Sequence, residues 1–312
     1  MKYHHNPVMK KEVLKYLKLE KNGLYVDCTL GGCGHAELIL KNIGPEGKLI
    51  GIDHDKTAIE NANKVLSKYL DRIILFKTNF SNIKKVLKKA EINKVNGILA
   101  DLGVSSHHFD EGKRGFSFNH DGPLDMRMDK DLKLTAYNIV NEYSSSAIFR
   151  ILKIYGEEKF ASKITSQIVR AREKKAVKST RELASLVKDA VPAKFSSKMK
   201  IHPATKTFMA LRIEVNKELE ALETFLNDAP YLLKKNGRLC ILNFTSAEDK
   251  IVMNKFKELS IQCKCPPKLP VCVCGGKSDF KLITRKPLRP ENEEIISNPR
   301  ARSTKLRVLE KI

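Results

Sequence analysis

Short apolar runs alternate with amphipathic segments along the first hundred residues of the chain. Apolar runs such as "GLYVDCT" and "RIILFKTNF" have the length and composition of buried strands. Between them lie segments such as "HAELILKNIG" and "KTAIENANKVLSKYL", in which apolar residues recur three and four positions apart, as on one face of a helix. This alternation continues through Gly103 and predicts βαβ units, and therefore a parallel sheet.

The strand pattern stops after "VNGILADLG", and the next hundred residues are loop and helix. The stretch "RGFSFNHDGPLDMRMD" is rich in Gly, Asp and Asn and predicts an ordered loop. Three helical stretches follow: "YNIVNEYSSSAIFRILKIYG", "EEKFASKITSQIVRARE" and "STRELASLVKDAV". The last begins with a capping box, formed by Ser179 and Glu182.

The strand pattern resumes in the last third of the chain. The predicted elements are, in order, a helical segment at residues 205–237 that ends at Asn236–Gly237, a fifth strand at 237–244, a helix at 248–259 and late strands at 280–288 and 305–312. The whole pattern predicts an α/β fold with a doubly wound sheet and an inserted all-helical domain. We expect the sheet domain at residues 1–106 and 206–312, and the insert at 107–205.

Positive charge is the strongest feature of the composition. The chain has 58 Lys and Arg against 36 Asp and Glu, a formal net charge of +22. The segment from Arg150 to Lys200 alone holds 14 basic and 5 acidic residues, and residues 281–312 hold 9 and 4. Lys-rich surfaces also keep ordinary proteins soluble, but this clustering favours a nucleic-acid partner.

The apolar content and its distribution indicate a soluble protein. A hydrophobic fraction of 42% supports a packed interior. No uncharged apolar run of about 18 residues occurs, and the N-terminus does not resemble a signal peptide. We therefore expect a cytoplasmic protein with no membrane partner. The sequence leaves the oligomeric state open, with a homodimer among the options.

Seven cysteines without a secretory signal indicate reduced thiols. The last four form the pattern C-x-C, six residues, C-x-C, at Cys263, Cys265, Cys272 and Cys274. Four thiolates suffice for a structural zinc site, but such sites usually have C-x2-C spacing. Buried, inert thiols are the simpler interpretation, and we expect no metal.

A glycine-rich loop, "TLGGCGH", joins the first strand to the next helix. Such a loop lets backbone N–H groups approach a ligand at a helix N-terminus. Gly31, Gly32 and Gly34 do not form the G-x-G-x-x-G pattern of a pyrophosphate-binding dinucleotide fold. A nucleoside cofactor without phosphates fits better, although a tight turn with no ligand is the alternative.

Two acids follow strands beside this loop. Asp53 ends the second strand, 22 residues beyond Gly31, where an acid can accept hydrogen bonds from ribose hydroxyls of NAD or S-adenosylmethionine. Asp101 ends the fourth strand. Because the carboxyl ends of parallel strands form the ligand crevice of an open sheet, Asp53 and Asp101 together favour a binding site.

Nearly the whole chain resembles the RsmH (MraW) family of methyltransferases. The motifs that carry the resemblance are "HNPVM", "VDCTLGGCGH", "GIDHD", "DLGVSS", "RGFSFNHDGPLDMRMD", "YGEEKFASKI", "HPATKTFMALRIEVNKELEAL" and "NPRARSTKLRV". The resemblance implies a class I S-adenosylmethionine-dependent methyltransferase fold. It also implies methylation of cytosine N4 in the decoding region of small-subunit (16S) ribosomal RNA. The sequence leaves open whether the substrate is naked RNA or the assembled 30S subunit, although a basic insert that recognises shape suits the assembled subunit.

The resemblance also implies a set of cofactor-binding positions. These are Cys33, Gly34, His35, Asp53, Phe80, Asp101 and His108. Cys33 replaces a glycine of the family and His108 replaces a glutamine. In the fifth strand the family's S-F-H-S-L-E-D-R falls on Asn243–Lys250, so Thr245 stands where the family has histidine.

These departures leave two alternatives to the family's activity. One is a divergent paralogue that modifies another RNA, and the other is an RNA-binding ribosome-assembly protein that has lost turnover. An NAD-dependent oxidoreductase is a third, more distant alternative, because the dinucleotide motif is missing.

For catalysis we expect Asp101, or backbone carbonyls in "DLGVSS", to accept a hydrogen bond from cytosine N4. The alternative role of Asp101 is to bind the cofactor. The target base must leave its stack, and Phe116 and Phe118 are candidates to hold it, although loop packing is the commoner role of such aromatics. Arg127 is a further substrate-binding candidate that we expect to order the same loop through Asp125. Basic helices of the insert would bind RNA phosphates.

Overall fold

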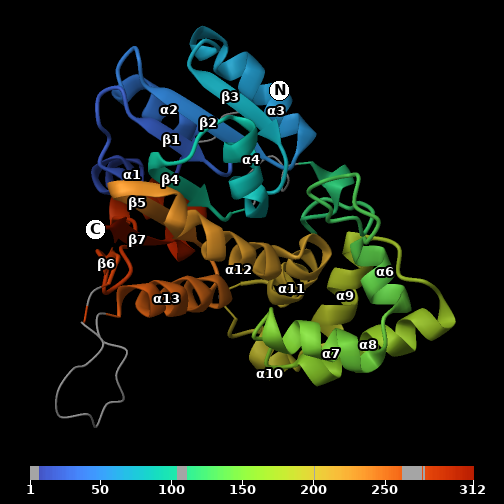
Figure 1. The fold of residues 1–312 in the computed structure, drawn as a ribbon. Coiled ribbons are helices and arrows are strands. Elements are labelled where there is room, and N and C mark those ends of the chain that lie inside the picture. Colours follow the sequence, from blue (N-terminus) through green and yellow to red (C-terminus); the bar gives the residue numbers. More distant parts are fainter. Residues whose placement is uncertain (1–6, 104–110, 200, 262–275, 277) are drawn as a thin grey trace, which may run out of the picture. The chain divides into compact units, whose positions relative to one another are not determined.

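The structure is a computed structural model of the chain, and it describes residues 7–103, 111–199, 201–261, 276 and 278–312 (Figure 1). The chain divides into two compact units. The sheet unit comprises Met1–Gly103 and Leu219–Ile312, and the helical unit comprises Val104–Glu218.

The sheet unit contains a seven-stranded sheet with the strand order β3-β2-β1-β4-β5-β7-β6. The strands are β1 (Leu24–Asp27), β2 (Lys48–Asp53), β3 (Ile73–Lys77), β4 (Val95–Asp101), β5 (Leu233–Asn243), β6 (Phe280–Leu282) and β7 (Lys305–Lys311). Strands β1 to β5 are parallel, and β7 runs antiparallel to both β5 and β6. The predicted α/β fold with a doubly wound sheet is confirmed.

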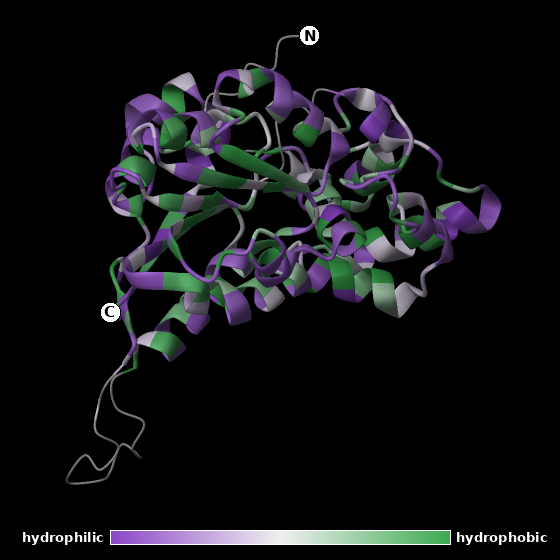
Figure 2. Cartoon of the chain, turned by 45° about the horizontal axis from the view of Figure 1, so that its top comes forward, coloured by the Kyte–Doolittle hydropathy of each residue, from purple (hydrophilic) through white to green (hydrophobic). Residues whose placement is uncertain are grey.

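Helices cover both faces of this sheet. They are α1 (Lys10–Leu17), α2 (Gly34–Asn42), α3 (Lys56–Val65), α4 (Ile83–Lys89), α12 (Glu218–Asp228), α13 (Ser246–Ser260) and α14 (Asn292–Ser297). Along β4, Ile98 and Ala100 join the core that contains α4, α12 and α13, whereas Leu99 joins the core that contains α1, α2 and α3. Because both faces are buried, the central strands β1, β2 and β4 are mostly apolar rather than alternating, and green strands run through this unit in Figure 2.

The helical unit has its own hydrophobic core. Its helices are α6 (Ala136–Glu142), α7 (Ser145–Ile154), α8 (Ala161–Lys174), α9 (Thr180–Ala190), α10 (Ala193–Ser196) and α11 (Thr205–Asn216). The predicted capping box is present, because the Ser179 hydroxyl accepts from the Glu182 N–H at 3.2 Å and the Glu182 carboxylate accepts from the Ser179 N–H at 3.1 Å. The predicted insert ended at residue 205, whereas α11 lies within the helical unit.

The prediction of one helical segment over residues 205–237 is wrong. Lys217 has a positive φ of 50° and separates α11 from α12, and α12 ends at Asp228. Pro230 then lies in a 3₁₀ turn, and β5 begins at Leu233, which pairs with Val95 across a register irregularity. Lys234 and Lys235 gave this stretch a polar character that hid the early start of the strand.

Two other boundaries differ from the sequence pattern. Residues 137–156 form two helices, because Tyr143 is extended and the Ser144 hydroxyl caps α7 by accepting from the Ala147 N–H. Helix α14 was not predicted at all. None of the helices in the described residues has the length and apolar character needed to cross a bilayer.

Candidate active site

The glycine-rich loop between β1 and α2 is fastened to the end of β2. The Gly31 N–H donates to Asp53 Oδ2 at 2.9 Å, and the Cys33 N–H donates to the Leu30 carbonyl at 2.6 Å. Gly31 and Cys33 both have positive φ, 44° and 67°, which turns the chain sharply into the helix. Asp53 thus shapes the loop that was predicted to approach a ligand.

Cys33 occupies a left-handed position that favours glycine, the residue that the resembling family has here. Its side chain is fully buried, and burial first, with nearby carboxylates, raises the pKa of the thiol to about 12. The thiol is therefore neutral and packs as a small apolar group among residues of the core below α2.

Gly34 begins α2 in contact with the N-terminal part of the chain. A Cβ on Gly34 would lie 2.6 Å from two ring carbons of Pro7. No side chain fits at Gly34 unless Pro7 moves. The glycine-rich loop is therefore held from one side by Pro7 and from the other by Asp53.

Asp53 keeps acceptor capacity beyond its structural bonds. Its Oδ2 accepts from the Gly31 N–H and its Oδ1 accepts from the Asp55 N–H, each at 2.9 Å. A carboxylate has about four lone-pair sites. Because Asp53 is only partly buried, it can also accept from a pair of ligand hydroxyls.

Asp101 lies at the end of β4 and faces α2. Its N–H donates to Thr29 Oγ1 at 2.7 Å, and its Oδ2 lies 3.8 Å from His35 Nε2. Its Oδ1 is buried and has no hydrogen-bond partner among the described residues. Desolvation raises the pKa of this carboxyl to about 7, with Glu248 adding to the rise and the Gly103 backbone opposing it.

A third acid, Asp27, was not among the predicted site residues. It ends β1, next to β4, and is 1% exposed. Its Oδ1 accepts from the Thr29 N–H at 3.1 Å, whereas its Oδ2 has no partner within the described part of the chain. Burial, with Asp101 and Asp53 nearby, raises its pKa well above the usual range. Its place at a strand end before the glycines was the signal that could have identified it.

The cofactor-side aromatic predicted at Phe80 follows β3 in a 3₁₀ turn. It is partly buried, and its ring meets that of Phe225 edge-on at 5.3 Å between centroids. Its role at the cofactor stays a prediction.

His108 lies outside the described residues, as do Cys263, Cys265, Cys272 and Cys274. The described residues contain no cluster of three His, Cys, Asp or Glu that could hold a metal.

The altered fifth-strand segment forms a helix cap. Thr245 caps α13 by accepting from the Glu248 N–H, and Glu248 accepts from the backbone of Phe244 and Thr245 at 2.8 and 2.9 Å. The Phe244 ring covers Gly103, where a Cβ would lie 2.7 Å from it. Thr245 therefore acts as a cap at the position where the resembling family has histidine. Asn243, just before it, is fully buried and neither amide atom has a described partner.

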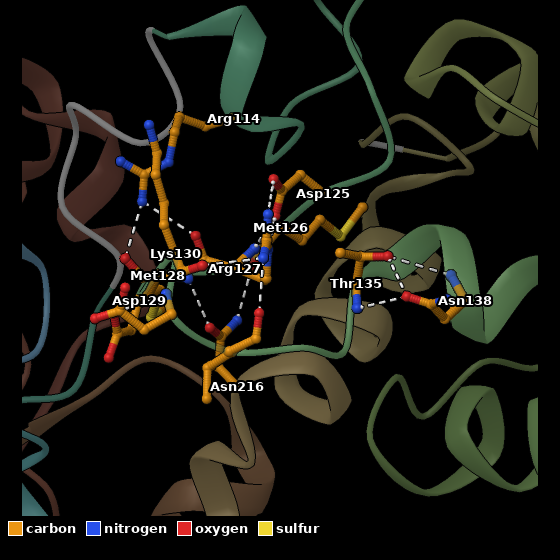
Figure 3. Close-up of polar contacts among 12 residues, drawn as sticks. Arg114, Asp125, Met126, Arg127, Met128, Asp129, Lys130, Thr135, Asn138 and Asn216 are labelled. Carbon is orange, nitrogen blue, oxygen red and sulfur yellow. Dashed lines mark hydrogen bonds and ion pairs between the residues drawn. The ribbon is translucent and has the colours of Figure 1, made fainter.

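Hydrogen bonds to side chains hold the loop at residues 114–129 within the helical unit (Figure 3). Asn216 of α11 donates to the Met126 carbonyl and accepts from the Met128 N–H, both at 2.8 Å. Arg127 makes two bonds to the Asp125 carboxylate, at 2.7 and 3.0 Å. The expected pairing of Arg127 with Asp125 is confirmed, and Arg127 also donates to the Leu132 carbonyl at 2.6 Å.

The two phenylalanines of this loop differ in their surroundings. Phe116 is 5% exposed and belongs to the core of the helical unit, as the packing interpretation expects. Phe118 is partly buried, with its ring 4.5 Å from the exposed ring of His202 and 5.1 Å from that of Phe208. Substrate binding by Phe116, Phe118 and Arg127 stays a prediction.

The sheet unit brings three acids together around one glycine-rich loop. Asp27, Asp53 and Asp101 end the neighbouring strands β1, β2 and β4. Buried carboxylate oxygens with no partner favour a ligand that carries hydroxyl groups or an ammonium group. Three carboxyl groups at neighbouring strand ends would repel a phosphate, so the site is poorly suited to phosphates.

Comparison with known proteins gives a consistent result over the whole chain. The MraW methylase family matches residues 2–312. The proteins named ribosomal RNA small subunit methyltransferase H from Clostridium botulinum (strain Kyoto / Type A2) and Clostridioides difficile (strain 630) are 49% and 47% identical over 312 residues, covering 100% of this chain and of each relative. The protein of the same name from Fusobacterium nucleatum is 48% identical over 309 residues, which are 99% of this chain and 97% of the relative. The chain therefore belongs to the MraW methylase family.

Proposed function

We propose that the protein transfers a methyl group from S-adenosylmethionine to N4 of a cytosine in small-subunit ribosomal RNA. The observation that carries the proposal is the set of three acids around the glycine-rich loop. Two of their oxygens, Asp27 Oδ2 and Asp101 Oδ1, are buried without a partner among the described residues. Membership of the MraW methylase family supports methyl transfer as the reaction at this site. The names of the relatives support small-subunit ribosomal RNA as the substrate.

The residues of the site fit this cofactor. S-Adenosylmethionine has ribose hydroxyls and an amino-acid ammonium group but no phosphate, which suits acids and backbone N–H groups. Asp53 would accept from the ribose hydroxyls, Asp27 and Asp101 would face the ammonium side, and Phe80 would lie against the adenine. The loop residues Cys33, Gly34 and His35 would line the same side. When bound, the cofactor supplies an electrophilic methyl group.

Asp101 is suited to act on the nucleophile. The lone pair of cytosine N4 is delocalised into the ring, and a hydrogen bond from the amino group to the Asp101 carboxylate increases its availability. As the nitrogen–carbon bond forms and the methyl–sulfur bond breaks, the nitrogen must release a proton, which the carboxylate can take. A pKa near 7 lets Asp101 accept that proton and return it to water. Alignment of the two reactants can supply roughly 7–11 kcal/mol of the barrier reduction.

The helical unit is suited to bind the RNA. Basic residues are concentrated in it, with 14 basic and 5 acidic residues between Arg150 and Lys200. A surface that contacts phosphates suits recognition of folded RNA by shape, as in an assembled 30S subunit. Such an enzyme acts where ribosomes assemble, in the cytoplasm, and either a monomer or a homodimer is compatible with this role.

Methyl transfer to unmodified small ribosomal subunits tests the proposal. Labelled S-adenosylmethionine is the donor, and nucleosides from digested RNA are analysed by mass spectrometry. We expect label in N4-methylcytidine or its 2′-O-methylated form. Label in another nucleoside would indicate a paralogue with a different target. Cofactor binding without any transfer would indicate an RNA-binding protein without turnover.

The Asp101→Asn variant separates the two roles of Asp101. If Asp101 acts on the nucleophile, turnover should fall at least about a hundredfold while cofactor affinity stays within about threefold. If Asp101 only binds the cofactor, affinity falls instead and turnover at saturating cofactor is retained. Asp71→Asn, an exposed acid in the same unit, is the matched control and should change neither quantity.

A further inference from the structure

Two aromatic rings meet at the surface of the helical unit. Phe195 lies on the short helix α10 and is 54% exposed. Its ring meets that of Phe160, the N-cap residue of α8, with centroids 5.3 Å apart and planes inclined by 58°. Phe160 is half-buried and packs against the core of the unit, so it fixes one side of Phe195 and leaves much of the other ring open. We call Phe160 and Phe195 the aromatic ledge.

Basic residues flank the aromatic ledge. Lys163 follows Phe160 by three positions on α8, and Lys194 and Lys198 stand on either side of Phe195 in the chain. All three are exposed, and no carboxylate among the described residues pairs with them. Two acids also adjoin Phe160: Glu158 accepts from the Phe160 N–H at 2.9 Å, and Glu157 is exposed. With Lys159, the four lysines around the ledge outnumber these two acids, so the ledge keeps an excess of positive charge.

The charge continues along α8. Lys163, Arg170 and Lys174 are exposed, and Arg170 and Lys174 lie seven and eleven positions after Lys163, which places all three on one face of the helix. No carboxylate within the described ranges pairs with Arg170 or Lys174 either. At 1.5 Å per residue the face spans about 16 Å, long enough to follow a phosphate backbone over several nucleotides. We call these three residues the basic face of α8.

We propose that the aromatic ledge stacks an unpaired base of the RNA substrate, while the basic face of α8 binds the neighbouring phosphates. A single exposed phenylalanine is ordinary on a protein surface. An exposed ring braced by a second ring and bordered by unpaired cations is the combination that single-stranded nucleic acid requires. A lipid surface fits less well, because α10 has only four residues and presents one large apolar side chain. The proposal rests on the proposed function, because it takes RNA as the partner of this surface.

The absence of tryptophan from the chain allows a direct test. The Phe195→Trp variant of the full-length protein contains one tryptophan, whose fluorescence reports on the ledge. We expect an unstructured RNA 12-mer and unmodified small subunits each to quench it saturably, because a stacked base quenches indole. Phe149→Trp, at a residue on α7 that is 40% exposed in the same unit, is the matched control and should be quenched little.

Affinity measurements complete the test. Phe195→Ala and Phe195→Leu should each weaken binding of the 12-mer about tenfold, whereas Phe149→Ala should change it less than twofold. Leucine keeps the apolar surface but cannot stack, so retained affinity in Phe195→Leu would contradict stacking. Circular dichroism melting and cofactor affinity should match wild type in every variant. If a variant fails this check, the test relies on the Phe195→Trp titration, which measures RNA binding directly and does not depend on a loss of affinity.

The remaining outcomes overturn the proposal in distinguishable ways. Equal quenching at positions 195 and 149 would mean non-specific association. A blue shift with anionic phosphatidylserine vesicles and no RNA quenching would assign the ledge to a membrane surface. Concentration-dependent quenching without RNA would assign it to a second copy of the chain. If wild type methylates ribosomal RNA but RNA does not quench Trp at position 195, base stacking on the ledge is contradicted and the proposed function stands. If RNA quenches this Trp but wild type transfers no methyl group, stacking is supported and the proposed function is contradicted.

Discussion

At the scale of single residues, the candidate site depends on carboxyl groups that are buried in the folded protein. Asp101 and Asp27 both have raised pKa values, and in both cases burial is the first cause. Each keeps one oxygen with no partner among the described residues. Because such groups cost folding free energy, they indicate that binding, rather than stability, accounts for these side chains.

The raised pKa of Asp101 predicts a particular dependence of stability on pH. In the unfolded chain the carboxyl loses its proton near pH 4, whereas in the folded protein it keeps the proton up to about pH 7. The folded state therefore binds more protons between these values, and the free energy of unfolding should fall as pH rises through this window. Urea unfolding of the cofactor-free protein at a series of pH values measures this.

The Asp101→Asn variant should remove part of that fall. Asp27 keeps its own contribution of the same sign, so the dependence should become shallower without vanishing. Asp71→Asn should leave the profile unchanged, since its side chain is exposed. An Asp101→Asn profile identical to that of wild type would show that Asp101 is already ionised near pH 4 in the folded protein.

At the scale of elements, the sequence predicted what depends on local pattern and missed what depends on distant partners. The strands that end at Asp53 and Asp101 were found because apolar runs are flanked by turn residues. The start of β5 was missed because Leu233 is a strand residue only through its pairing with Val95. The place of Asp27 at a strand end could be read from the sequence, but its burial and its missing partner appear only when β1, β2 and β4 lie side by side.

The loop at residues 114–129 illustrates a partner that no local pattern reveals. Asn216 donates to the Met126 carbonyl and accepts from the Met128 N–H. Asn216→Ala should destabilise the protein by about 2–4 kcal/mol, because it leaves buried backbone groups unsatisfied. Urea unfolding measures the loss. Asn63→Ala, which removes a bond from an exposed helix position to the Ile59 carbonyl, should cost less than about 1 kcal/mol. Similar losses in the two variants would mean that Asn216 does not hold the loop.

At the scale of the whole molecule, a net charge of +22 makes salt concentration a probe of RNA binding. Replacing Lys163, Arg170 and Lys174 together by alanine should weaken RNA binding. It should also reduce the slope of log K against log salt by about two units, because each phosphate contact contributes about 0.7–0.9. Alanine at Lys64, Lys85 and Lys88, three exposed lysines of the sheet unit, removes the same charge. An equal change of slope in that control would mean that net charge, rather than the basic face of α8, determines binding.

The position of β7 has a consequence for how the protein is made. This strand, Lys305–Lys311, is the last element of the chain, yet it lies inside the sheet between β5 and β6. Asp249, in the first turn of α13, is also bound by Arg307 and Lys305 of β7, at 2.8 and 3.1 Å. During synthesis the helical unit is complete while β7 is still to be made, because chains fold from the N-terminus as they emerge. The edge of β5 therefore stays uncovered until residues 305–311 have emerged from the ribosome, so the sheet closes later than the helical unit can fold.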